Sequence, residues 1–160
     1  MRSQSSNPLF YALCLTVALI MSSCNRKAIY SHYEHTDIYN GWERGDTLEF
    51  LVPKVGEEGT YSEELGLRTT MTYPFTSLTM IVSQQALPSG FSRNDTVTME
   101  LTDEEGNRLG DGITLYQNVY ALPDIHLSEQ DSLRIVVLHN MKRESLPGIS
   151  DVGMTIRRKK

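Results

Sequence analysis

Histidines are the first residues in this sequence that could support catalysis or hold a metal ion. His32 and His35 lie three positions apart, with two acidic residues close by. A structural zinc site needs about four ligands, so two histidines without a further fixed ligand are a weak signal, and solvated side chains explain them better. His139 lies among aliphatic residues, which favours a packed structural histidine over a catalytic one. The histidines therefore predict neither a metal site nor a catalytic site.

Acidic residues gather in one glycine-rich stretch, at Asp103, Glu104, Glu105 and Asp111. Carboxylates can bind calcium, but their spacing here does not match an EF-hand loop, and an acidic solvated turn is the simpler interpretation. The sequence also lacks a nucleophile elbow, a phosphate-binding loop and a dinucleotide fingerprint. We therefore expect no catalytic residue, no cofactor and no enzymatic activity.

An apolar run near the start of the chain indicates a targeting segment. Residues 1–8 contain one cation, Arg2, and no acid, whereas residues 9–20 are almost all apolar. The run is shorter than the roughly 20 residues that a membrane-spanning helix needs. A charged start, a short apolar middle and small residues before a cleavage point are typical of a secretory signal peptide. We assign residues 1–23 to this signal.

The end of this segment, Met21-Ser22-Ser23-Cys24, resembles the lipobox of bacterial lipoproteins, with methionine in place of the usual leucine. The resemblance implies that Cys24 is acylated and becomes the first residue of the mature chain. Lipoproteins carry several acyl chains, and several chains anchor a protein stably where one anchors it only marginally. Cys14 lies inside the apolar run and leaves with the signal, so we expect no disulfide.

The composition of the chain describes one globular domain with no preference for nucleic acid. The chain has 160 residues, of which 39% are hydrophobic, and a net charge of -5, as is ordinary for a single domain. Phosphate contacts need a basic face, and the basic run at residues 157–160 is expected to be a solvated tail. Residues 24–40 are polar without a clear period, so we expect a lipidated N-terminus and tether there and the folded domain at residues 41–160.

Hydrophobic residues in this domain alternate with a period of two, which is typical of β-strands. The alternation predicts strands within residues 46–52, 64–73, 77–84, 95–102, 131–140 and 151–158. Glycine, proline, asparagine and aspartate separate these runs and indicate turns. No segment has a sustained helical period, although Ser128 could cap a single helical turn. Roughly seven or eight antiparallel strands imply two packed sheets, so the expected fold class is all-β, a single β-sandwich of jelly-roll or immunoglobulin-like type.

Four residues form a candidate interaction patch on this domain: Trp42, Tyr73, Pro74 and Phe75. The Tyr73-Pro74 bond is a candidate for the cis form, because only bonds that precede proline adopt cis readily. Two interpretations are open, namely an exposed recognition patch and a bend that packs both rings against the edge of the sandwich. Trp42 fits a plug at the entry of a strand better than an exposed platform.

Several short blocks follow the lipobox in order. They are Trp42 with Asp46-Thr47, Leu67-Arg68 with Tyr73-Pro74-Phe75 and Leu78, Asp95-Thr96 with Leu101, Asp103 and the glycines at 106, 110 and 112, and a final block of His139, Met141, residues 146–153 and Ile156. No single block is specific, but their order resembles the gliding motility lipoprotein GldH family. The resemblance implies a non-catalytic, membrane-anchored envelope lipoprotein, an accessory or assembly component linked to gliding motility and type IX protein secretion.

The same resemblance implies a location, partners and a modification. The residues after Cys24, Asn25-Arg26-Lys27, lack the acids that usually flag export to the outer surface in this lineage. We therefore expect the periplasmic face of the outer membrane, with other envelope proteins of the gliding and secretion machinery as partners. Three Asp-Ser/Thr-aliphatic triplets resemble O-glycosylation acceptors, although Asp-Thr at a strand start is also ordinary turn chemistry. The candidate acceptor residues are Thr47, Thr96 and Ser132.

The alternative function is that of a glycan-binding β-sandwich lipoprotein in a nutrient-uptake system. Modules of that kind expose flat aromatic platforms. The chain has one tryptophan and eight tyrosines, so the exposure of Trp42 separates the two functions.

Overall fold

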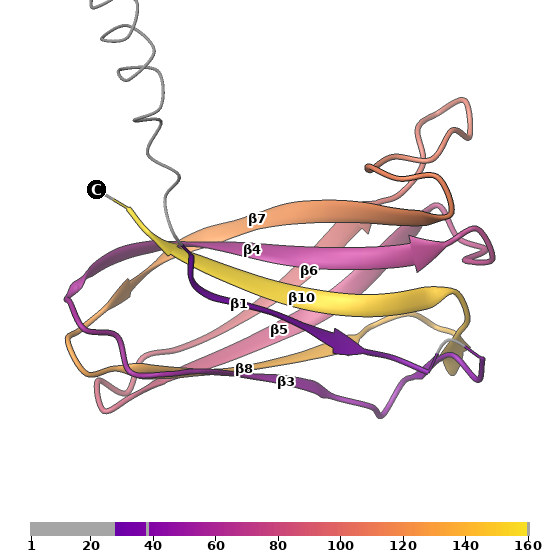
Figure 1. The fold of residues 1–160 in the computed structure, drawn as a ribbon. Coiled ribbons are helices and arrows are strands. Elements are labelled where there is room, and N and C mark those ends of the chain that lie inside the picture. The colour runs from indigo at the N-terminus through magenta and orange to yellow at the C-terminus, as the bar shows by residue number, and fades with distance from the viewer. Residues whose placement is uncertain (1–27, 38, 160) are drawn as a thin grey trace, which may run out of the picture.

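The computed structural model describes residues 28–37 and 39–159 (Figure 1). Regular structure within these residues consists of β-strands, and no helix among them has the length and apolarity to cross a membrane. The strands are β1 (Ala28–His35), β2 (Trp42–Glu43), β3 (Leu48–Val52), β4 (Gly59–Thr70), β5 (Ser77–Leu87), β6 (Ser92–Glu100), β7 (Leu115–Leu127), β8 (Ser132–His139), β9 (Ser145–Leu146) and β10 (Ile149–Arg158).

The eight longer strands form two antiparallel sheets of four strands each. One sheet has the order β1-β10-β4-β7 and the other has the order β3-β8-β5-β6, while β2 and β9 form a separate short pair. Figure 1 shows the two sheets stacked face to face along the length of the molecule. The structure confirms the predicted all-β sandwich.

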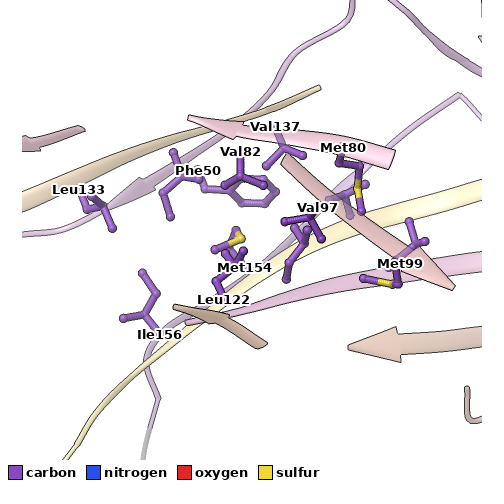
Figure 2. Packing of buried hydrophobic residues seen from close by; sticks show 14 of the residues in the cluster. Phe50, Met80, Val82, Val97, Met99, Leu122, Leu133, Val137, Met154 and Ile156 are labelled. Carbon is purple, nitrogen blue, oxygen red and sulfur yellow. The ribbon is translucent and has the colours of Figure 1, made fainter. Parts of the chain in front are cut away.

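The core lies between the two sheets and follows the alternation of the sequence. Every second residue of β8 is buried, from Leu133 to His139, because successive side chains of a strand point to opposite faces. Figure 2 shows Phe50, Val82, Val97 and Met154 gathered between the sheets. Full burial of one such side chain contributes roughly 1.5–3 kcal/mol. Residues with an exposed fraction of zero include Phe50, Leu65, Leu67, Leu78, Met80, Val82, Ile135, Val137, Met154 and Ile156.

The alternation did not predict β7, although it is the longest strand. Within the described sheets it is an edge strand, with β4 as its neighbour. It contains Pro123, and its register with β4 shifts between Tyr61 and Glu63. Proline within a sheet is confined to edges and irregular positions. The same features that suit β7 to an edge therefore hide its period in the sequence.

Two local predictions are wrong. Residues 128–131 form a turn rather than a helical turn, because the buried Asp131 carboxylate accepts hydrogen bonds from the backbone N–H of Ser128 and of Ser89, both at 2.9 Å. The cis peptide bond among the described residues is Leu87-Pro88 and not Tyr73-Pro74. The backbone N–H of Tyr73 instead donates to the Thr70 carbonyl, at 3.3 Å, and closes the turn that follows β4.

The expected tether differs from the structure, because eight of its residues form the strand β1. β1 pairs antiparallel with β10, from Ala28 opposite Arg157 to His35 opposite Asp151, so the sandwich includes residues that were expected to precede it. The Tyr30 ring packs partly buried against the core, whereas the next inward ring is that of the exposed His32, 6.5 Å from Phe50. Both faces of β1 mix polar and aromatic residues, which conceals the alternation.

On the outward face of β1, the side chain of Tyr33 packs over two glycines of the neighbouring strands. Gly153 of β10 lies opposite Gly66 of β4, and the ring of Tyr33 covers both, so that a Cβ at either position would overlap it. The guanidinium of Arg68 lies 4.0 Å from the centroid of the same ring. Glycine inside a strand often marks such a close approach. The strand is therefore held by a specific ring-over-glycine contact as well as by backbone hydrogen bonds.

Candidate functional site

One end of the sandwich, which we call the anchor end, is where β1 begins and β10 ends (Figure 1). Cys24 lies outside the described residues, so its acylation stays a prediction. Ala28 follows Cys24 by four positions, and four residues span at most roughly 14 Å at 3.3–3.6 Å each. A lipid on Cys24 would therefore hold the anchor end close to the membrane surface.

The described residues of the C-terminal basic run, 157–159, are part of the fold and not the expected solvated tail. Arg157 and Arg158 are the last residues of β10. Arg157 forms an ion pair with Glu64, at 2.6 Å, Arg158 pairs with Glu57, and Lys159 pairs with Asp124. Glu64 lies on β4, Asp124 lies on β7 and Glu57 lies just before β4. Segments distant in the sequence therefore supply these carboxylates, a relation that no local pattern reveals.

The candidate interaction patch is wrong as an exposed surface, because two of its four residues lie in the core. Trp42 has an exposed fraction of 1%, and its indole N–H donates to the Asp46 carbonyl at 2.9 Å. Its ring meets that of His139 edge to face, with centroids 5.3 Å apart. Trp42 is thus a plug beside the entry to β3, the interpretation that the sequence favoured for this residue.

The other three residues of the patch form the bend between β4 and β5. Tyr73 is buried, and its hydroxyl donates to the Ser77 carbonyl at 2.9 Å. Burial raises the pKa of Tyr73, so it stays a neutral donor. Phe75 is half-buried and meets Tyr73 edge to face, with centroids 5.5 Å apart. Pro74 is exposed. The structure therefore agrees with the second interpretation, a bend that packs both rings.

His139 is a core residue, as its aliphatic neighbours predicted. Its exposed fraction is zero, and its Nδ1 accepts a hydrogen bond from the backbone N–H of Met141 at 3.4 Å. Burial lowers the pKa of His139, because the charged imidazolium is costly away from water. The residue is a neutral packing partner for Trp42 under neutral conditions.

The three candidate O-glycosylation residues lie in different environments. Thr47 is exposed in the loop before β3, and Thr96 is exposed in the edge strand β6. Ser132 is half-buried at the start of β8, where its hydroxyl donates to the Leu87 carbonyl at 3.3 Å. The geometry leaves Thr47 and Thr96 as the accessible candidates.

The sequence analysis missed a buried polar cluster that joins the two sheets. Glu63 of β4 accepts hydrogen bonds from the Gln84 side chain of β5, at 3.1 Å, and from Arg93 of β6, at 2.5 Å. Arg93 also forms an ion pair with Asp95, at 2.6 Å. Glu63 and Gln84 occupy positions where the alternation demands an apolar residue. A polar residue at an inward position was the signal in the sequence for this cluster. The sequence could not identify the hydrogen-bond partner, because the partner lies on the other sheet.

Replacing Glu63 by glutamine is expected to change how stability depends on pH. Burial raises the pKa of Glu63, despite the opposing effects of Gln84 and Arg93. The folded wild type therefore keeps a proton that the unfolded chain has lost, and its free energy of unfolding falls as pH rises from about 4.5 through the raised pKa. Urea unfolding across this pH window should show that the free energy of unfolding declines less in Glu63→Gln than in the wild type. Glu64→Gln, on the outward face, is the control, and equal profiles in wild type and Glu63→Gln would contradict the prediction.

The acidic stretch between β6 and β7 is a well-bonded loop. The Asp103 carboxylate accepts hydrogen bonds from the backbone N–H and the side-chain amide of Asn107, at 2.7 and 2.9 Å, and the side-chain bond is the main cause that lowers the pKa of Asp103. Asp111 exchanges two backbone hydrogen bonds with Gln117 of β7, at 2.8 and 3.0 Å. The loop thus folds back on β7 and covers part of its free edge.

Comparisons with known proteins agree on one family. The sequence profile of the GldH lipoprotein family matches residues 28–156. The chain is also 27% identical over 154 residues to the gliding motility lipoprotein GldH of Flavobacterium johnsoniae, an alignment that covers 92% of this chain and 95% of that protein.

Similar solved structures include two carbohydrate-binding modules. A family 35 module from Clostridium thermocellum has a TM-score of 0.42 and 10% identity, over 79% of this chain and 87% of the module. A family 28 module specific for non-crystalline cellulose has a TM-score of 0.40 and 12% identity, over 80% of this chain and 72% of the module. Scores this low carry no argument about ligands. The profile match, by contrast, begins at the first residue of β1 and ends within β10. The chain belongs to the GldH lipoprotein family.

Proposed function

We propose that this gliding-motility lipoprotein is a non-catalytic accessory or assembly component linked to the type IX protein secretion machinery, anchored in the envelope through acylated Cys24. The observation that carries the proposal is the family match over nearly the whole sandwich. The start of β1 only four positions after Cys24 supports it, because a short connection suits a domain that works next to a membrane.

The proposed location is the periplasmic face of the outer membrane. The support for this face is the sequence Asn25-Arg26-Lys27, which carries two cations and no acid directly after the lipidated cysteine. In this location the partners are other envelope proteins. Glycosylation of Thr47 or Thr96 is proposed with it, since both hydroxyl side chains are exposed.

A structural rather than catalytic role suits the interior of the domain. Arg93 forms ion pairs with both Glu63 and Asp95, and His139 packs against Trp42. The alternative function, glycan binding, is less well supported, because Trp42, the main candidate for an exposed aromatic platform, is buried.

The proposed function is tested by deleting the chain in its native bacterium and restoring it as wild type or as Cys24→Ala. Colony spreading and the amount of a type IX cargo in the medium are measured in each strain. The deletion and the Cys24→Ala strain are expected to lose cargo secretion, and the wild-type copy is expected to restore it. Unchanged secretion and unchanged spreading in the deletion strain would reject the function.

A further inference from the structure

The sandwich has two different ends, and the end opposite the anchor end carries its largest projecting loop. Tyr61 of β4 pairs with Arg158 at the anchor end, whereas Thr70 of β4 pairs with Leu115 at the other. We call this second end the tip and define it as residues 71–76 and 101–115. Nine residues along a strand at 3.2–3.4 Å each place the tip roughly 30 Å from the anchor end. Figure 1 shows the loop between β6 and β7 projecting there, away from the C-terminal end of the chain.

The tip is held in a defined shape by hydrogen bonds. The guanidinium of Arg108 donates to the Tyr73 carbonyl at 2.6 Å and to the Met71 carbonyl at 3.2 Å, which ties the loop to the bend after β4. The Asp103–Asn107 and Asp111–Gln117 hydrogen bonds brace the rest of the loop. A surface fixed in advance loses little conformational entropy when it binds a partner.

Large apolar side chains are exposed on this braced surface. Ile113 has an exposed fraction of 85% and Met71 one of 67%, and Leu109 and Leu115 are exposed as well. Single exposed apolar residues are ordinary on protein surfaces, but four of them lie within the tip, and we call these four the apolar group. Groups of this kind with a polar rim mark sites of protein interaction.

The loop between β6 and β7, which carries Leu109 and Ile113, is acidic. Residues 100–115 contain five acids and one cation, Arg108, whose Nη2 is engaged with backbone carbonyls. An open groove of about 610 Å³ is lined by Leu109, Thr76, Thr102 and four of the acids, Glu100, Asp103, Glu104 and Glu105. An apolar side chain among carboxylates complements a surface that presents an apolar side chain among lysines or arginines.

We propose that the tip is a docking surface for an envelope protein that presents an apolar contact ringed by basic side chains. The inference rests on the proposed function, because it identifies where an assembly component meets its partner. The lipid on Cys24 holds the anchor end at the membrane, and the tip faces the periplasm with its apolar group uncovered. A second copy of this chain is a poor occupant, because two acidic tips repel each other.

The test places a photoreactive phenylalanine analogue at Ile113 of the full-length chain in its native bacterium. The matched control places it at Leu51, an apolar residue of β3 with an exposed fraction of 64% that lies outside the tip. Irradiation is expected to join Ile113, but not Leu51, to one envelope protein through a peptide that contains lysine or arginine. The double variant Glu104→Lys/Glu105→Lys is expected to lower the cross-linked yield roughly tenfold, since opposite charges become like charges.

A second double variant, Glu57→Lys/Glu58→Lys, makes the same change in net charge at the anchor end and is expected to leave the yield unchanged. Any of three results would overturn the docking surface. They are equal cross-linking at Leu51, a product made of two copies of this chain, and a yield that stays the same after the tip charges are reversed. A chain that stays in the membrane fraction but gives no product at Ile113 overturns the docking surface alone. A chain that leaves the membrane fraction but still gives the product overturns the anchor alone.

Discussion

Replacement of Cys24 by alanine is expected to release the protein from the membrane fraction. Acyl chains contribute roughly 0.8 kcal/mol for each buried CH₂ group, and the described residues contain no helix that could substitute as a span. The measurement is separation of membrane and soluble fractions, with the intact mass of the native protein. The wild-type mass is expected to exceed that of residues 24–160 by the acyl groups, and any further excess reports sugar on Thr47 or Thr96.

Cys14→Ala is the matched control for this experiment, because Cys14 lies in the signal peptide assigned from the sequence. This variant is expected to be processed and anchored like the wild type. A Cys24→Ala protein that stays bound to the membrane, or that matures to the wild-type mass, would contradict the lipid anchor.

Replacement of Trp42 by alanine is expected to lower the free energy of unfolding by about 3–5 kcal/mol, the usual cost of deleting a buried large aromatic side chain. The indole is almost fully buried, packs on His139 and donates to the Asp46 carbonyl. The loss is a large share of the 5–15 kcal/mol that stabilises a typical domain. Urea unfolding followed by circular dichroism measures it without depending on the fluorescence of the chain's one tryptophan.

Trp42→Phe separates the two contributions to this effect. It keeps most of the ring contact with His139 but removes the indole N–H. The free energy of unfolding is therefore expected to fall by a smaller amount, about 1–2 kcal/mol. If Trp42→Ala unfolded at the same urea concentration as the wild type, Trp42 would not be the core plug described here.

The strands whose inward face is mainly apolar could be predicted from the sequence. β8 is an example, because Leu133, Ile135 and Val137 alternate without interruption and are all buried. β7 and β1 escaped prediction because proline, register shifts and polar residues interrupt their alternation, as edge strands tolerate. The other two edge strands, β3 and β6, keep a regular apolar face and were predicted. The period that identifies a strand is clearest where one face is apolar and buried along its length.

The candidate site residues divide in the same way. His139 as a packed histidine and Trp42 as a plug followed from their neighbours in the chain. Whether the proposed patch is exposed could not be predicted from neighbouring residues, because residues far away in the sequence bury Tyr73. The cluster of Glu63, Gln84 and Arg93 was also invisible, because its hydrogen bonds cross between two sheets.

The sequence alone predicted a targeting segment, a lipobox cysteine and an all-β domain, because each depends on local patterns of charge, size and alternation. The structure confirms the all-β domain. Tertiary structure decided which residues meet. It paired β1 with β10, the C-terminal strand. It also placed Tyr33 over Gly66 and Gly153 and left Ile113 and Met71 exposed at the tip. The physical reason is that alternation sets which face of a strand is buried, whereas strand order and register, formed between distant segments, set what each face contacts.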